Sequence, residues 1–158
     1  MPHTAESIRT SSNDRLKTEV IEPWVVALAS ADAFLAAPEA VRAIVCLWTL
    51  HARSAGEGIA AFVAATPPVV GDFVPEAARI LDVPLVAERW SRATAGMDRA
   101  AQHGVALSEV TWGDRLEAEQ LEDELVCLHP TDVQRHVLRH LRARADELAA
   151  LTRERGPA

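Results

Sequence analysis

Aromatic residues, cysteines and long apolar runs are all scarce in this chain. Its 158 residues include two cysteines, three phenylalanines, four tryptophans and no tyrosine. Cys46 and Cys127 both lie in apolar stretches that we predict to be helical, where free thiols are usually buried and reduced. The longest apolar run, Ala43 to Trp48, is far shorter than the roughly 20 residues that cross a bilayer. We therefore expect no disulfide framework and no membrane span.

Positive charge is also in short supply. The chain has 16 lysine and arginine residues against 23 aspartate and glutamate residues, which gives a net charge of −7. A protein that binds nucleic acid directly needs a basic face, so this balance argues against that function. Residues 1–17 are polar and lack the apolar core of a secretory signal. We therefore expect a cytoplasmic protein.

No motif for catalysis or phosphate binding is present. The chain has no Walker A loop, no dinucleotide fingerprint and no HExxH zinc signature. On the last predicted helix, Asp132, His136 and His140 share one face, and two histidines at this spacing can share a metal ion. The flanking Arg135 and Arg139 repel a cation, and no third ligand is secured. We therefore predict no metal site and no cofactor; the alternative is a small metal- or ligand-dependent enzyme built on this helix.

One segment is apolar on nearly every side of the helix that it predicts. From Pro38 to Ser54 only Arg42 and Thr49 interrupt the apolar residues between positions 40 and 50. A helix without a polar stripe is typical of the interior of a bundle. Pro38 suits the first helical turn, and we expect the sequence Ser54–Gly58 to end the helix.

Helical spacing of apolar residues continues along the chain. It predicts further helices at residues 23–37, 57–65, 72–81, 85–103, 112–128 and 131–151. Residues 105–111 alternate weakly and are expected to form a loop. The predicted fold is all-α, a single-domain bundle of six or seven helices around the buried helix at residues 38–54. We expect residues 1–15 to be a flexible N-terminal segment, residues 16–152 the helical domain, and residues 153–158 a flexible C-terminus.

Negative charge is concentrated between Glu109 and Glu124. This stretch has seven acidic residues and one basic residue, Arg115. On a helix that turns Leu121 and Leu125 inward, acidic neighbours three and four positions apart lie about 5–6 Å from each other, a spacing of the same order as phosphates along a nucleic-acid strand. The outward acids are Glu119, Glu122 and Asp123, with Glu117 and Glu124 beside the buried stripe. The alternatives are a plain solvated surface, or pairing with the Arg-rich last helix within the chain or across a dimer.

Two segments carry a family resemblance. Leu50 to Phe62, LHARSAGEGIAAF, is similar to the signature L-D-A-E-V-N-N-G-G-F-x-Q-F, with matches at Leu50, Ala52, Gly58 and Phe62. Leu121 to Leu125, LEDEL, resembles an L-D-D-x-F segment. Both belong to a bacterial family of domains of unknown function that includes an acidic DNA-mimic protein. The Asn and Gln positions of the signature are replaced here, so their roles do not carry over. The resemblance implies an all-helical, dimeric protein without known catalysis.

These patterns together predict a non-enzymatic, acidic interaction protein. Its partner is expected to be a basic or DNA-binding protein, so that the chain acts as a DNA-mimic-like regulator. An immunity- or antitoxin-like protein that neutralises a basic partner is the alternative, and it would use the same surface. The predicted partner-binding residues are Glu117, Glu119, Glu122, Asp123 and Glu124.

Overall fold

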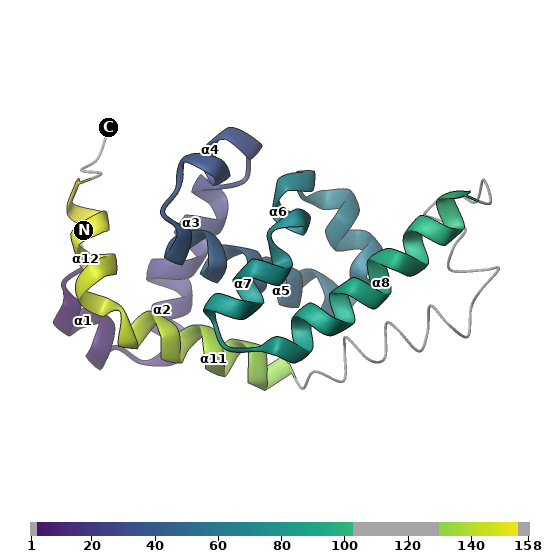
Figure 1. Cartoon of the computed structure of the whole chain (residues 1–158). Helices are drawn as coiled ribbons and strands as arrows, with labels where there is room; N and C mark the ends of the chain where they lie inside the picture. The colour runs from purple at the N-terminus through teal and green to yellow at the C-terminus, as the bar shows by residue number, and fades with distance from the viewer. Residues whose placement is uncertain (1–2, 103–129, 155–158) are drawn as a thin grey trace.

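The chain folds as a series of helices arranged along one elongated body. The computed structural model describes residues 3–102 and 130–154, and every regular element among them is helical, which confirms the predicted all-α fold. Figure 1 shows α1 (Ala5–Thr10) and α12 (Ala145–Glu154) at one end, with α8 (Pro84–Gln102) extending to the other. Helices from the two ends of the chain therefore lie side by side. None of the described helices combines the length and apolarity needed to cross a membrane.

The centre of the fold is α5 (Glu39–Ala65), which runs through the middle of the body (Figure 1). Between Ala40 and Trp48 every residue except Arg42 is buried. This half of the helix is packed on several sides because it has no polar stripe to present to water. The predicted buried central helix is thus confirmed.

The central helix is longer than the sequence indicated. We expected Ser54–Gly58 to end it and a separate helix to cover residues 57–65, but α5 continues through this stretch without interruption. A glycine inside a helix costs about 1 kcal/mol relative to alanine, and burial of apolar residues beyond the stretch offsets that cost. Ile59 and Phe62 are both buried, and the Phe62 ring packs edge-on against Trp90 at 5.6 Å between centroids.

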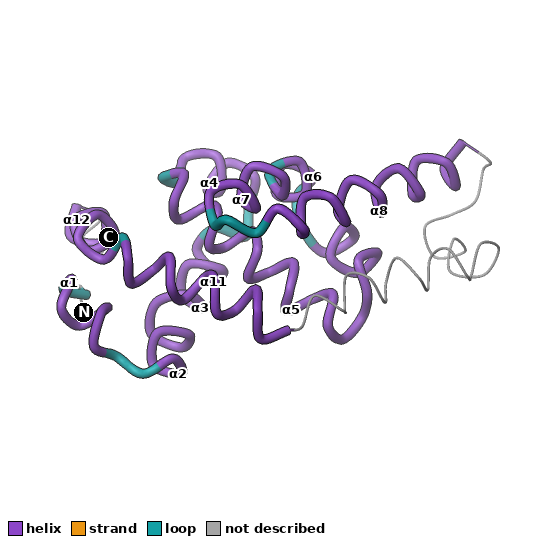
Figure 2. Tube along the Cα trace, turned by 60° about the horizontal axis from the view of Figure 1, so that its bottom comes forward, coloured by secondary structure: helices purple, strands orange, loops and turns teal. Residues whose placement is uncertain are grey.

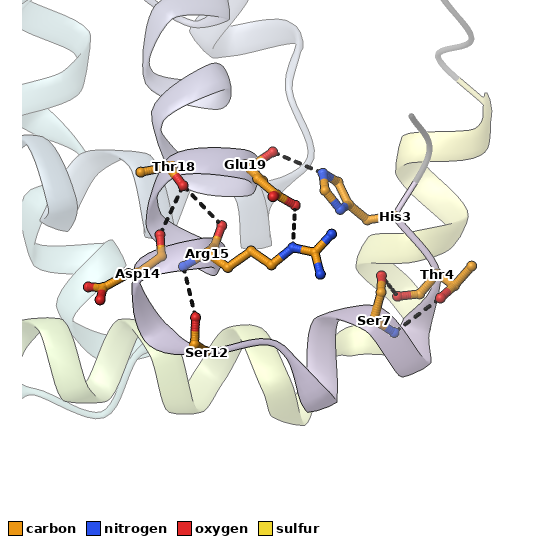
Figure 3. Close-up of polar contacts among 8 residues, drawn as sticks. All are labelled: His3, Thr4, Ser7, Ser12, Asp14, Arg15, Thr18 and Glu19. Atoms are coloured by element: carbon orange, nitrogen blue, oxygen red, sulfur yellow. Dashed lines mark hydrogen bonds and ion pairs between the residues drawn. The ribbon is translucent and has the colours of Figure 1, made fainter.

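The helical part of the chain also begins earlier than expected. Residues 1–15 were predicted to form a flexible segment, but α1 packs against α12 and its Ile8 side chain is fully buried. The Thr4 hydroxyl caps α1 by accepting a hydrogen bond from the backbone N–H of Ser7 (Figure 3). The segment is too short and has too few apolar residues to show a helical period, so its sequence does not predict a helix. Its packing on α12 depends on the tertiary fold.

Three short elements follow in an unbroken run: α2 (Asn13–Leu16), the π-helix η1 (Lys17–Ile21) and α3 (Glu22–Ala27). Pro23 lies in the first turn of α3 and has no N–H to donate to the carbonyl of Glu19, four residues earlier. That carbonyl accepts a hydrogen bond from the His3 ring, at 2.9 Å from Nε2, as Figure 3 shows. The N-terminal residues thus satisfy a backbone group that the proline leaves without its helical donor.

The predicted helix at residues 23–37 is two helices. After α3, the chain turns at Leu28 and starts again as α4 (Ala31–Ala36), capped by the Ser30 hydroxyl, which accepts from the Ala33 N–H at 3.2 Å. Serine favours such caps because its side chain competes for backbone N–H groups. On α4, Phe34 is buried, whereas Leu35 is 56% exposed.

Two short helices, α6 (Pro68–Asp72) and α7 (Val74–Ile80), connect α5 to α8. Phe73 precedes α7, and Pro75 lies in its first turn, where its missing N–H has no helical partner to lose. Asp82 then turns the chain with φ of 56°, in the left-handed region. The predicted amphipathic helix at residues 85–103 is confirmed as α8, and its Val86, Trp90 and Ala93 are buried.

The last predicted helix, residues 131–151, is also divided. It consists of α11 (Pro130–Ala143), which packs on α5, and α12, and their axes diverge at Arg144 (Figures 1 and 2). The change of direction brings α12 onto α1 and buries Ala145, Leu148 and Ala149 completely. The expected loop at residues 105–111 and helix at residues 112–128 lie outside the described residues.

Candidate functional site

A cleft with a volume of about 560 Å³ opens along α11, and we call it the α11 cleft. Three parts of the chain that are distant in sequence form its walls: α11, the start of the α2–η1 run, and the buried half of α5. The lining residues are Asn13, Asp14, Lys17, Trp48, Gln134, Arg135, Leu138, Arg139 and Arg142.

The rim of the α11 cleft is strongly basic. Arg135, Arg139 and Arg142 are spaced four and three residues apart, so they share one face of α11. Lys17 joins them from the first turn of η1, and Asp14 is the one acidic residue in the part of the lining that the structure describes. Trp48 and Leu138, which are 6% and 7% exposed, supply the apolar part of the lining. The cleft therefore combines an apolar surface with a positive rim.

Hydrogen bonds fix the two ends of the α11 wall. Arg142 Nη2 donates to the Ser11 carbonyl at 3.1 Å and to Asn13 Oδ1 at 2.7 Å, so this guanidinium ties α11 to the residues around the start of α2. Gln134 Nε2 lies 3.1 Å from His51 Nε2 on α5. Since an amide nitrogen only donates, the His51 nitrogen accepts and the ring is neutral. Burial lowers the pKa of His51, in agreement with a neutral ring.

The structure places the candidate metal ligands His136 and His140 on α11, with His140 half-buried. The His140 Nε2 atom is buried and has no hydrogen-bond partner among the described residues. Burial lowers the pKa of His140, and the nearby Arg144 lowers it further. Within residues 3–102 and 130–154, no three His, Cys, Asp or Glu side chains are grouped so that they could hold a metal ion. The Asp132 side chain is not among those described.

Cys46 is a buried thiol, as predicted for it. Its Sγ donates a hydrogen bond to the Val70 carbonyl at 3.3 Å, which joins α5 to α6. Burial raises the pKa of the Cys46 thiol, so the reactive thiolate is disfavoured. The position is structural. Cys127 lies outside the described residues.

The predicted partner-binding residues, Glu117, Glu119, Glu122, Asp123 and Glu124, all lie outside the described residues. Leu50 and Phe62, which carry the family resemblance, are buried apolar positions of α5. The α11 cleft itself was not predicted, although the Arg135, Arg139 and Arg142 spacing marks a basic stripe on one helix. Comparison with family models, with curated proteins and with solved structures returns no match to this chain.

Proposed function

We propose that this chain is a non-enzymatic interaction protein that binds a basic protein, of the DNA-binding class, through the acidic segment Glu109–Glu124. One observation carries the proposal. The segment has seven acidic residues and one basic residue, whereas the remaining chain has 16 acidic and 15 basic residues. The net charge of −7 therefore resides almost entirely in one short stretch, and the rest of the protein is close to neutral.

Concentrated charge of one sign suits recognition of an oppositely charged partner. Exposed charges at an interface act mainly on the association rate and on partner selection, and salt screens them over about 10 Å at 0.1 M. The resemblance to a family with a DNA-mimic member supports the same interpretation. An immunity-like protein that neutralises a basic partner would use the same acidic residues, so the identity of the partner distinguishes the two forms of the proposal.

The first experiment identifies the partner. The immobilised chain is incubated with an extract of its source cells, and the bound proteins are eluted with rising salt and identified by mass spectrometry. We expect a basic protein that elutes at moderate salt. A DNA-binding partner whose DNA complex is displaced by the chain supports the mimic form, and a toxic enzyme that is inhibited supports the immunity form.

The second experiment tests the acidic segment directly. The triple variant Glu119→Lys, Glu122→Lys and Asp123→Lys should bind the identified partner at least a hundredfold more weakly than wild type at low salt. The matched control is Glu22→Lys, Asp32→Lys and Asp72→Lys, three exposed acids on the described helices that give the same change in net charge. If the triple variant binds as tightly as wild type, the segment is only a solvated surface and the proposal is wrong.

A further inference from the structure

The volume of the α11 cleft falls in the range of small-molecule sites. Pockets that bind small ligands typically have volumes of about 300–1,000 Å³ and combine an apolar lining with a few polar groups. The α11 cleft, at about 560 Å³, falls in this range. Trp48 and Leu138 are the apolar residues among its described lining, and both are largely buried.

The charges around the cleft favour an anionic group on that ligand. Arg139 and Lys17 have no ion pair with any acid in the described part of the chain. Among the described lining residues, four are cationic and Asp14 is the one acid. The planar fork of an arginine matches carboxylate and phosphate oxygens. A concave site with one sign of charge also focuses its potential on the ligand.

Part of this arrangement is fixed before any ligand binds. Arg142 is held by Ser11 and Asn13, and Gln134 is held by His51. Lys17 is the first residue of the π-helix, an element that is rare in proteins and frequent at functional sites. A site that is already ordered loses less conformational entropy on binding, which favours affinity for a small ligand.

The whole-chain charge distinguishes a small anion from a large one. The chain as a whole is acidic, with a net charge of −7, which disfavours a long polyanion such as nucleic acid, whereas a small anion needs only the basic side chains that line the cleft. We propose that the α11 cleft binds a small organic anion, with its carboxylate or phosphate group between Arg139 and Lys17 and its apolar body against Trp48 and Leu138. The described residues that line this site are not those of the acidic segment in the proposed function.

Calorimetric titration with 1-naphthyl phosphate and with 2-naphthoate tests the proposal, and comparing the two probes shows which anionic group the cleft prefers. We expect saturable one-to-one binding of at least one probe. Inorganic phosphate and 1-naphthol, which each supply one half of a probe, should bind at least tenfold more weakly. Arg139→Gln and Lys17→Gln should each weaken binding by about tenfold, since each removes a charged contact.

The control is Arg53→Gln, which removes an exposed arginine of α5 that does not line the cleft. It should leave the affinity for both probes within about twofold of wild type, since it makes the same change in net charge. Thermal unfolding of every variant shows that the fold is kept. Failure of both naphthyl probes to bind, or equal affinity in wild type and Arg139→Gln, overturns the proposal. Tighter binding of a single-stranded oligonucleotide or a glutamate-rich peptide, lost in Arg139→Gln, reassigns the cleft to a macromolecule.

Discussion

α5 and α11 pack against each other but face their surroundings differently. In the first half of α5, from Ala40 to Trp48, the surface is in contact with other helices almost all round. In α11, an inner face of apolar residues is buried while Arg135 and Arg139 on the outer face are exposed. The comparison separates two patterns of burial: the first half of α5 is enclosed by other helices, whereas α11 is buried on one face and exposes arginines on the other.

The largest effect should come from Trp48, the α5 residue that belongs both to the core and to the cleft. Trp48→Ala should lower the free energy of unfolding by about 3–5 kcal/mol, because truncating a buried aromatic leaves a cavity. Urea denaturation followed by circular dichroism measures this. Trp24→Ala, at a half-buried position, is the control and should cost less. An unchanged denaturation midpoint for Trp48→Ala would show that the first half of α5 is not a packed core.

The inner face of α11 should behave like α5. Leu141 is fully buried, and Leu141→Ala should lower the free energy of unfolding by about 2–5 kcal/mol. Leu35→Ala, at a position that is 56% exposed on α4, is the matched control and should change stability by under about 0.5 kcal/mol. Urea denaturation again measures the change in the free energy of unfolding. If that change is similarly small for both leucine variants, α11 is not packed against the core.

Each of the two helices also carries a half-buried histidine that should make stability depend on pH. Burial lowers the pKa of His51 on α5, and burial followed by Arg144 lowers the pKa of His140 on α11, although Glu147 acts in the opposite direction. Protonation thus favours the unfolded chain, in which histidine titrates near about 6.5. Stability should therefore fall as the pH drops below that value.

Urea midpoints at about pH 7.5 and about pH 5.5 measure this effect, which we expect to be smaller than either core truncation. The loss of stability between the two pH values should shrink in His140→Gln and in His51→Gln, because each variant removes one group that takes up a proton on unfolding. If both variants lose as much stability as wild type, the histidines titrate alike in the folded and unfolded chain.

Local sequence patterns were sufficient to predict helices with a continuous apolar run or a regular apolar period. The apolar run from Ala43 to Trp48 indicated an interior helix, and the helical spacing of apolar residues at 85–103 predicted α8, whose Val86 and Trp90 are buried. The same patterns gave wrong predictions of where helices begin, break and end. The interruptions at Ser30 and Arg144 and the continuation of α5 past Ser54 depend on tertiary contacts, which outweigh local helix propensity.

The α11 cleft shows the same limit at the level of a site. The sequence marked Arg135 and Arg139 as neighbours of two histidines, and Trp48 as a core residue, each considered within its own helix. Lys17 had no pattern of its own. Only the packing of α11 on α5 and beside the α2–η1 run brings these residues to one space, and periodicity contains no information about which helices become neighbours.

The smallest expected effects lie on the outer face of α11, where two arginines allow the sharpest comparison. Arg142 donates to Ser11 and Asn13, so Arg142→Gln should lower the free energy of unfolding by about 1 kcal/mol, the net contribution of a typical hydrogen bond. Arg139→Gln, on the same face, should change it by under about 0.5 kcal/mol, since exposed positions rarely affect stability more. Urea denaturation of both variants at one pH measures the difference.

Because Arg139 is also the residue we place against the anionic group, this variant should lose affinity for the naphthyl probes without losing stability. Equal destabilisation by both substitutions would show that Arg139 serves the fold and not a ligand.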